Sequence, residues 1–409
     1  MRSSTRALIS AIAISATGGV PALLLGSVGV QVKEDIALSD TQLGAAIAVF
    51  FLVAMLASAT MGRVIDTVGW RLSLRLLASL TAVTLVLVAV LGRSFLPLAL
   101  ALAVGGFAFS GASAASNLAV VQDVPRHRHG VALGIKQAAV PISTFFTGLA
   151  VPLVALTIGW RWAFAIALLL PLVTLLTIPR DARGAEAIGR GATPLGAAVR
   201  AALPGSGARR PLVGPGLVEE RRLWLLALAG GLASIGVGAL NGFTVITLVD
   251  AGVGPGRAGY LVALAGILSA LSRIVLGWLA DRRPERAFVI VAMLIGSGVV
   301  GYALLAVVTP GSAVVAVAIA FAGGWGWPGL FHFGIVSAYA RTPGRATGVI
   351  QAGFAAGLIA GPGLFGLLSD LVGYGFAWSV NAVLAGIASV MVLRLRPRDP
   401  VDATAPARS

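Results

Sequence analysis

The chain has 409 residues, of which 58% are hydrophobic and 11% are charged, and it carries a net charge of +15. Soluble globular domains carry about 25% charged residues, so this composition excludes that class. The mean hydropathy of +0.96 agrees, because a water-soluble fold could not bury so much apolar surface. The composition predicts a protein that lies in a lipid bilayer.

Long apolar segments recur along the whole chain. A helix needs about 20 apolar residues to cross a hydrocarbon core about 30 Å thick. The sequence therefore predicts an all-α integral membrane protein with twelve transmembrane helices. A transmembrane barrel would alternate in stretches of about ten residues, and that pattern is absent. The expected spans are 7–32, 41–61, 72–92, 97–121, 131–157, 160–178, 222–249, 257–280, 287–308, 311–340, 346–369 and 374–393.

Two features of the first span and the composition narrow the class further. Arg2 and Arg6 precede an apolar run that extends to Val32, which is longer than the 7–15 residues of a signal sequence, so a retained helix is expected. The chain has no cysteine, which excludes disulfides and thiol chemistry. Metal clusters, phosphate-binding loops and nucleophile elbows are also missing, so no cofactor and no enzymatic activity are expected.

The positive charge is distributed as in a membrane protein with both termini in the cytoplasm, so no nucleic-acid partner is expected. With that orientation, most of the 30 Lys and Arg residues fall in cytoplasmic segments. Four fall in external loops: Lys33, Arg93, Arg161 and Arg257. The distribution predicts a multi-pass protein of the plasma or inner membrane.

The chain divides into two similar halves. We expect an N-terminal six-helix bundle at 1–178, a cytoplasmic linker rich in Arg, Gly and Pro at 179–221, a C-terminal six-helix bundle at 222–393 and a cytoplasmic tail at 394–409. Three pairs of segments recur at an offset of 214 or 215 residues. They are Gly62–Asp66 with Gly277–Asp281, Gly134–Ala138 with Gly348–Ala352, and Gly159–Phe164 with Gly373–Trp378. Duplicated halves with a substrate site between them are a recurrent design of membrane carriers.

The segment Gly62–Arg71 resembles the signature loop of the major facilitator superfamily, G-x-x-x-D-x-x-G-R-R/K, with Trp70 in place of the first basic residue. The resemblance extends over essentially the whole chain, and it implies two six-helix bundles that rock about a central site. The loop itself predicts a cytoplasmic latch, in which Asp66 pairs with Arg63, Arg71 or a helix N-terminus. A solvated turn is the alternative. The predicted latch residues are Gly62, Asp66, Gly69, Arg71, Gly277 and Asp281.

Two basic residues lie inside predicted spans, where charge is costly and usually functional. Lys136 lies about 9 Å into the fifth span and Arg273 about 12 Å into the eighth, at 1.5 Å per residue. One interpretation is that both bind an anion in the central cavity, since an Arg fork suits a carboxylate. The other is that both side chains snorkel to the interface. Arg273 precedes Gly277 by four residues, which is similar to the eighth helix of monocarboxylate carriers and oxalate–formate exchangers, and that similarity implies carboxylate binding.

Further polar and aromatic residues are candidates for the cavity wall. Gln137 and Gln351 occupy equivalent positions in the two halves, and Gly323–Pro328 looks like a deformable helix segment or an aromatic belt. Buried Asn and Gln also serve merely as interhelical hydrogen-bond partners, which is the role expected for Asn381. The remaining candidates are Asn117, Asn241, Trp325, Trp327 and His332.

No Asp or Glu is expected in the middle of a span, which removes the usual carboxylate for proton coupling. Three modes of transport remain: anion exchange, uniport, and proton movement through His332 or protonated substrate. The sequence predicts a monomeric secondary transporter that moves a small organic anion across the inner membrane by alternating access. The alternative is an efflux carrier for drugs or amphipathic natural products, although the Gly-Pro motif typical of the fifth helix in such exporters is missing. A membrane sensor on the same scaffold is less well supported.

Overall fold

A computed structural model describes residues 3–125, 129–179, 217–282, 284–339 and 342–396, and every regular element in these ranges is a helix. The first half contains α1 (Ser3–Thr17), α2 (Val20–Ser27), α3 (Gly29–Ile36), α4 (Asp40–Leu91), α5 (Phe95–Asp123), α6 (His129–Ala150), the π-helix η2 (Val151–Ala155), α7 (Trp160–Ala167) and α8 (Leu169–Thr177). The second half contains α10 (Leu217–Asp250), α11 (Pro255–Arg282), the 3₁₀ turn η4 (Pro284–Arg286), α12 (Ala287–Ala306), α13 (Ala313–Gly324), α14 (Pro328–Ala338), α15 (Pro343–Val372) and α16 (Tyr374–Leu395).

The number of membrane-crossing helices agrees with the sequence. Ten helices in the described ranges are long and apolar enough to cross a bilayer, or eleven when α1 and α2, bent by 40°, count as one span. One of them, α4, has 52 residues and is roughly 78 Å long if straight, enough for two crossings. Splitting α4 in two is consistent with the predicted twelve.

Glycines with positive φ divide the chain at equivalent points. Gly69 has φ 78° and ψ 162° and breaks α4 between the second and third predicted spans. Gly159 and Gly373, 214 residues apart, both precede a helix and have φ values of 104° and 105°. Glycine adopts this region without steric cost. At Gly159 and Gly373 the repeat seen in the sequence is therefore also a repeat of backbone conformation.

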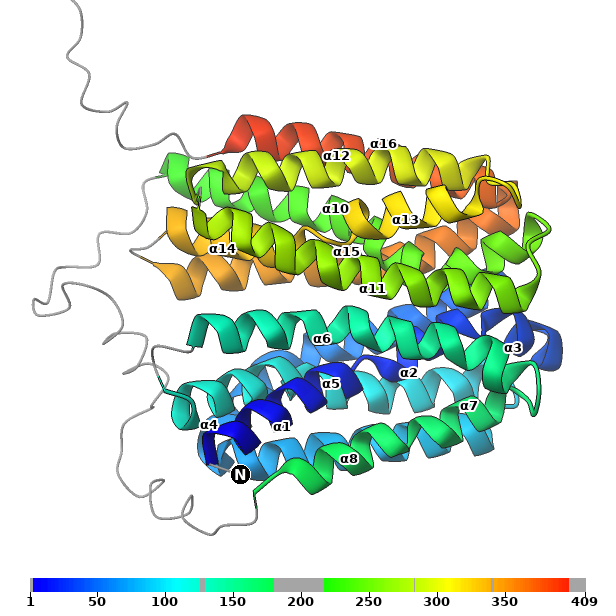
Figure 1. Cartoon of the computed structure of the whole chain (residues 1–409), viewed down its shortest axis with the longest axis horizontal. Coiled ribbons are helices and arrows are strands. Elements are labelled where there is room, and N and C mark those ends of the chain that lie inside the picture. The colour runs from blue at the N-terminus through cyan, green and yellow to red at the C-terminus, as the bar shows by residue number, and fades with distance from the viewer. Residues whose placement is uncertain (1–2, 126–128, 180–216, 283, 340–341, 397–409) are drawn as a thin grey trace, which may run out of the picture.

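The two halves lie against each other with their helices roughly parallel (Figure 1). The start of α1, the end of α8, the start of α10 and the end of α16 all lie at one end of the bundle, on the left of Figure 1. We call this the terminal end, and the opposite end the loop end. Most of the predicted linker and tail lies outside the described residues, and α10 already begins at Leu217, within the predicted linker.

Close backbone contacts join the halves where α2 meets α10 and along two seams that the internal repeat relates, one between α4 and α15 and one between α6 and α11. A Cβ placed on Gly44 would lie 2.1 Å from the carbonyl oxygen of Pro362, and one on Gly259 would lie 2.7 Å from the carbonyl oxygen of Gly148. These two contacts are equivalent by the internal repeat. Only glycine allows helices to approach this closely, as small residues do at interfaces between membrane helices.

Large apolar side chains cover the outside of the bundle. Leu176 and Val307, for example, are 76% and 73% exposed. So much exposed hydrocarbon is unfavourable in water and favourable in lipid, and it agrees with a protein whose lateral surface contacts acyl chains.

The seam contact at Gly44 leads to a prediction. Gly44→Ala forces α4 away from the carbonyl of Pro362, and overpacking of this kind costs about 1–3 kcal/mol. We expect a lower melting temperature in detergent, measured by intrinsic tryptophan fluorescence.

Gly348→Ala in α15 is the matched control, because a Cβ there would meet no atom within 4 Å. Alanine is the better helix former by about 1 kcal/mol, so this variant should melt at or above the parent temperature. A Gly44→Ala protein as stable as the parent would contradict the tight seam.

Candidate functional site

Lys136 is buried in α6 and points toward α5 of the same half. Its residue is 4% exposed, and its Nζ donates to Oδ1 of Asn117 at 2.6 Å and to the carbonyl oxygen of Ser113 at 3.4 Å. A buried ammonium needs such partners, because an unpaired charge away from water is very costly. In this conformation Lys136 and Asn117, both sequence candidates, therefore form one polar pair inside the first half.

Arg273 of α11 contacts the break between α13 and α14. Its Nη2 donates to the carbonyl oxygen of Trp325 at 3.0 Å, and its guanidinium carbon lies 5.1 Å from the centroid of the Trp325 ring. The helix is interrupted here, since α13 ends at Gly324 and α14 begins at Pro328. Pro328 has no N–H group for the carbonyl of Gly324, which accepts from the Trp327 indole instead. The carbonyl of Trp325 lies in the turn between the two helices. The side chain of Arg273 thus binds the backbone that the break makes available.

His332 and Gln351 link α14 to α15. Nδ1 of His332 lies 2.9 Å from the carbonyl oxygen of Pro328, and Nε2 lies 3.1 Å from Oε1 of Gln351. Two arrangements satisfy both bonds: a charged ring that donates twice, or a neutral ring that accepts from the Gln351 NH₂ group after rotation of the amide. The orientation of the amide is therefore coupled to the charge of the ring.

The two tryptophans of the break lie inside the second half. Trp325 is 5% exposed and Trp327 is 1% exposed. Trp327 packs edge-on against Phe331 and Phe354, with centroid distances of 5.8 and 4.9 Å, and its Nε1 donates to the carbonyl oxygen of Gly324 at 2.8 Å. In this conformation the pair packs into the core of the half.

Lys136 and Arg273 lie at a similar depth on two facing helices. A Cβ on Gly266 of α11 would lie 2.7 Å from the carbonyl oxygen of Pro141 of α6. Lys136 precedes Pro141 by five residues and Arg273 follows Gly266 by seven, so both lie about 8–10 Å from this contact toward the terminal end. Figure 1 shows α6 and α11 side by side across the boundary between the halves.

The other predicted wall residues are placed as follows. Asn241 of α10 donates to the carbonyl oxygen of Val237 in its own helix, and Asn381 of α16 donates to that of Ala377. The backbone oxygen of Asn241 lies 2.0 Å from a Cβ placed on Gly26, so Asn241 lies where α10 meets α2. The side chain of Gln137 lies outside the described part of the structure.

The predicted latch loop lies at the terminal end. Asp66 is exposed there, and Arg71 pairs with Asp123 of α5 at 2.8 Å rather than with Asp66. Gly62 has open space where its Cβ would be, and Gly69 forms the break in α4. The space around Gly277 and the side chain of Asp281 lie outside the described part of the structure, so the latch remains a prediction.

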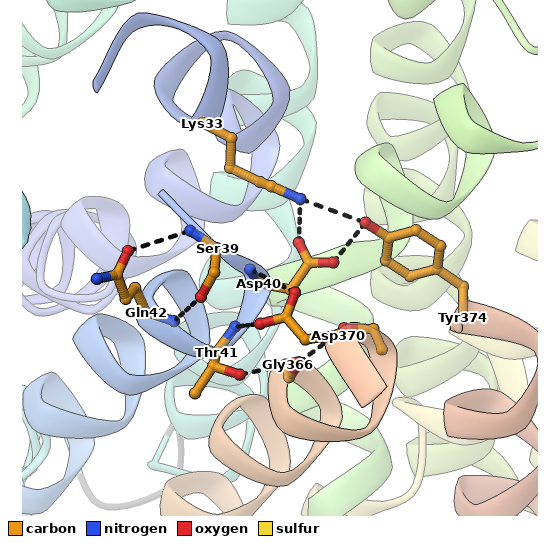
Figure 2. Close-up of polar contacts among 9 residues, drawn as sticks. Lys33, Ser39, Asp40, Thr41, Gln42, Gly366, Asp370 and Tyr374 are labelled. Atoms are coloured by element: carbon orange, nitrogen blue, oxygen red, sulfur yellow. Dashed lines mark hydrogen bonds and ion pairs between the residues drawn. The ribbon is translucent and has the colours of Figure 1, made fainter. Parts of the chain in front are cut away.

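A polar cluster joins the halves at the loop end (Figure 2). Asp40, at the start of α4, is 4% exposed; its carboxylate pairs with Lys33 and accepts a hydrogen bond from the Tyr374 hydroxyl of α16 at 2.5 Å. Asp370 of α15 accepts the backbone N–H groups of Asp40 and Thr41 at 3.1 and 2.7 Å. A carboxylate of the second half thus caps a helix of the first.

This cluster was not predicted from the sequence. Asp40 and Asp370 each flank a predicted span, where a carboxylate needs no special explanation. Ser39 and Gln42 do form a capping box that marks the start of α4, so the helix boundary carried a signal. The burial of Asp40 carried none, because its partner Tyr374 is 334 residues away.

Comparison with known families identifies the fold. A family model described as the Major Facilitator Superfamily matches residues 7–342 and again residues 226–409. The chain belongs to the major facilitator superfamily. The expectation of a membrane transporter family, not an enzyme family, is therefore confirmed.

One curated relative is similar in sequence. Monocarboxylate transporter 11 of Mus musculus is 32% identical over 234 residues, which cover 53% of this chain and 48% of the relative. The match thus spans about half the length of the curated protein.

Solved structures share the fold at low identity. A D-xylose–proton symporter has a TM-score of 0.73 and 16% identity, with 96% of this chain and 97% of the symporter covered. A bacterial homologue of the human lysosomal transporter Spinster, inward-facing and occupied, has a TM-score of 0.71 and 16% identity, with 98% of each chain covered. A nucleoside transporter has a TM-score of 0.72 and 14% identity, with 96% and 100% covered. These likenesses show the two-bundle fold and say nothing of the substrate.

The Lys136–Asn117 pair leads to a prediction. Asn117→Leu removes the 2.6 Å acceptor of a buried ammonium, and loss of a hydrogen bond to a charged group costs about 1.5–3 kcal/mol. We expect a clear fall in melting temperature. The double variant Asn117→Leu with Lys136→Met should recover most of it, because the charge that needed the partner is gone. Equal losses in the single and double variants would contradict the pair.

Proposed function

We propose that this protein is a secondary transporter for small organic anions, with Arg273 as the principal anion-binding group. The observation that carries the proposal is the position of the two intramembrane cations. Lys136 and Arg273 lie at a similar depth on α6 and α11, about 8–10 Å from the close contact of Gly266 with Pro141. Substrate sites of such carriers lie near the midplane between the two repeats, which is where these helices face each other.

The chemistry of Arg273 fits a carboxylate. Its planar guanidinium can donate two parallel hydrogen bonds to the two oxygens of one carboxylate, and such pairs are stronger than bonds to neutral acceptors. In this conformation the guanidinium instead donates to the neutral carbonyl of Trp325. An anion would displace this weaker acceptor, so binding would free the break between α13 and α14 from its contact with Arg273.

Lys136 plays a secondary part in this proposal. Its Nζ already has the Asn117 amide oxygen and the Ser113 carbonyl as acceptors, and both are neutral. An anion drawn to Arg273 would gain the long-range attraction of this second charge without direct contact. The name of the curated relative, a monocarboxylate transporter, also favours a carboxylate substrate.

His332 is the proposed titrating group when transport is coupled to protons. The described carboxylates lie in loops or near the ends of spans, and the buried Asp40 lies in the first turn of α4. The bonds of His332 to Pro328 and Gln351 join it to the same broken segment that Arg273 contacts. Exchange of one anion for another needs no such group.

Efflux of amphipathic compounds is the second candidate. It would rely on aromatic cavity walls, and Trp325 and Trp327 are the main aromatic residues near the break. Both are at least 95% buried, which favours the anion over the amphipathic compound.

We further propose that the protein is a monomer in the inner membrane. Both termini would lie in the cytoplasm, as the distribution of Lys and Arg indicates.

The proposal predicts anion-dependent stabilisation that requires Arg273. We expect a small monocarboxylate to raise the melting temperature of the purified protein, in a screen that also contains dicarboxylates, drugs and dyes. Arg273→Gln should weaken the affinity at least tenfold, about 1.4 kcal/mol. Lys136→Gln should weaken it less, because that cation contributes only at a distance.

Arg257→Gln is the matched control, since it removes the same charge from an exposed position of the same helix. It should bind like the parent protein. Stabilisation by hydrophobic cations or neutral drugs alone, unchanged by Arg273→Gln, would contradict the anion site and favour efflux. If an anion does stabilise the protein, uptake of that anion into liposomes that contain the purified protein would establish transport.

A further inference from the structure

The two seams at the loop end are related by the internal repeat, yet they differ in chemistry. α4 begins at Asp40 and α11 at Pro255, 215 residues later, so Thr41 corresponds to Gly256. The residues that these two positions contact are also related: Asp370, which contacts Thr41, corresponds to Leu156 at the offset of 214. The contact between Thr41 and Asp370 on one seam therefore has its equivalent between Gly256 and Leu156 on the other.

On the α4–α15 seam this contact is polar. Oδ2 of Asp370 accepts the N–H of Thr41 at 2.7 Å, and the Thr41 hydroxyl lies 3.4 Å from the carbonyl oxygen of Gly366 (Figure 2). Next to it, the Tyr374 hydroxyl donates to Asp40 across the same boundary at 2.5 Å. Three residues of one half thus bind the first turn of a helix in the other.

On the α6–α11 seam the equivalent contact is apolar. A Cβ on Gly256 would lie 3.6 Å from Cδ1 of Leu156 and 3.8 Å from Cβ of Pro152. One turn further along α11, Gly259 meets Val151, Pro152 and the backbone of Gly148. Contacts of this kind are lost on separation, and water does not replace them.

The tyrosine shows the same asymmetry. Tyr374 corresponds to Trp160, and the Trp160 indole Nε1 donates to Asp35 of its own half at 3.1 Å. Arg161 donates to the same carboxylate at 2.5 Å, and this bond lowers the pKa of Asp35 although desolvation opposes the shift. Trp160 thus binds a carboxylate of its own half, whereas its equivalent Tyr374 binds a carboxylate of the other half.

Both sides of the polar seam remain satisfied when it separates. The first turn of α4 has its own capping box, in which Ser39 accepts the N–H of Gln42 and Gln42 accepts the N–H of Ser39. Asp40 keeps Lys33, which belongs to its own half. Water can take the places of Asp370 and Tyr374 at this partly exposed end, so release leaves no buried charge without a partner.

We propose that the loop end opens asymmetrically. Asp370 and Tyr374 form a releasable latch on the α4–α15 seam at the loop end, separate from the predicted latch loop at the terminal end. The apolar α6–α11 seam stays in contact as the hinge. Both seams hold close backbone contacts, at Gly44 on one and at Gly259 on the other, so the difference lies in the outermost side-chain contacts. Exchange of polar bonds for water is nearly balanced, whereas separation of packed apolar side chains is not, so the polar seam is the one that opens first. The proposal concerns gating alone and does not depend on the identity of the substrate.

Single cysteines at equivalent positions test this directly, because the chain has no cysteine of its own. Ala48 lies in α4, 3.9 Å from a Cβ placed on Gly363 of α15. Its equivalent in α11 is Ala263, whose backbone nitrogen lies 2.5 Å from a Cβ placed on Gly148 of α6. Ala48→Cys and Ala263→Cys therefore report the opening of the two seams through their rates of labelling by a bulky membrane-impermeant maleimide.

The latch is removed by Asp370→Asn together with Tyr374→Phe, which retain the size of both side chains. We expect labelling of Ala48→Cys to become at least fivefold faster, and labelling of Ala263→Cys to change by less than twofold. Tyr374→Phe alone should give a smaller increase of the same kind. Asp35→Asn is the control, since it removes a carboxylate at the same end whose bonds stay within one half, and it should change neither rate.

Equal acceleration at both cysteines, in protein that melts like the parent, would overturn the hinge and indicate that the halves separate as a whole. Unchanged labelling at Ala48→Cys would overturn the latch. A misfolded double variant would label rapidly at both sites and show a lower melting temperature, and in that case the rates of Tyr374→Phe alone decide the question.

Discussion

Backbone contact between the two halves is the constraint on which the arrangement of the other residues depends. The seams bring the backbones so close that a single added carbon at Gly44 or Gly259 would overlap a carbonyl of the other half. Such contacts require glycine on one side and a well-placed backbone carbonyl on the other. They bring the two halves together along both seams.

The charged groups lie at two depths relative to these seams. The cations of α6 and α11 lie about 8–10 Å from the close contact of Gly266 with Pro141, toward the terminal end. Where the seams reach water, at the loop end, polar groups can bind across the boundary, and Asp40, Asp370 and Tyr374 do so. The proposed anion site and the proposed gate therefore lie at different depths of the bundle.

The broken helix of the second half brings two polar side chains to one segment. Pro328 interrupts the helix, Arg273 binds the carbonyl of Trp325, and His332 binds the carbonyl of Pro328 while contacting Gln351. Arg273 and His332 bind different carbonyls, that of Trp325 in the turn and that of Pro328 in the first turn of α14. Both side chains thus contact the segment from Trp325 to Pro328 that joins α13 to α14.

The sequence by itself determined the membrane environment, the helical spans, the internal repeat and the family. Hydropathy, glycine positions and a repeated motif are local properties of the chain, and each could be counted without knowing what packs against what. Gly159 and Gly373, which the repeat pairs, also have nearly the same φ value in the structure. Only the tertiary structure decided the partners of the charged residues: Lys136 with Asn117, Arg71 with Asp123, and Asp40 with Tyr374. These pairings depend on helices that meet after tens to hundreds of intervening residues, and burial, which makes a polar group need a partner, arises only when those helices pack.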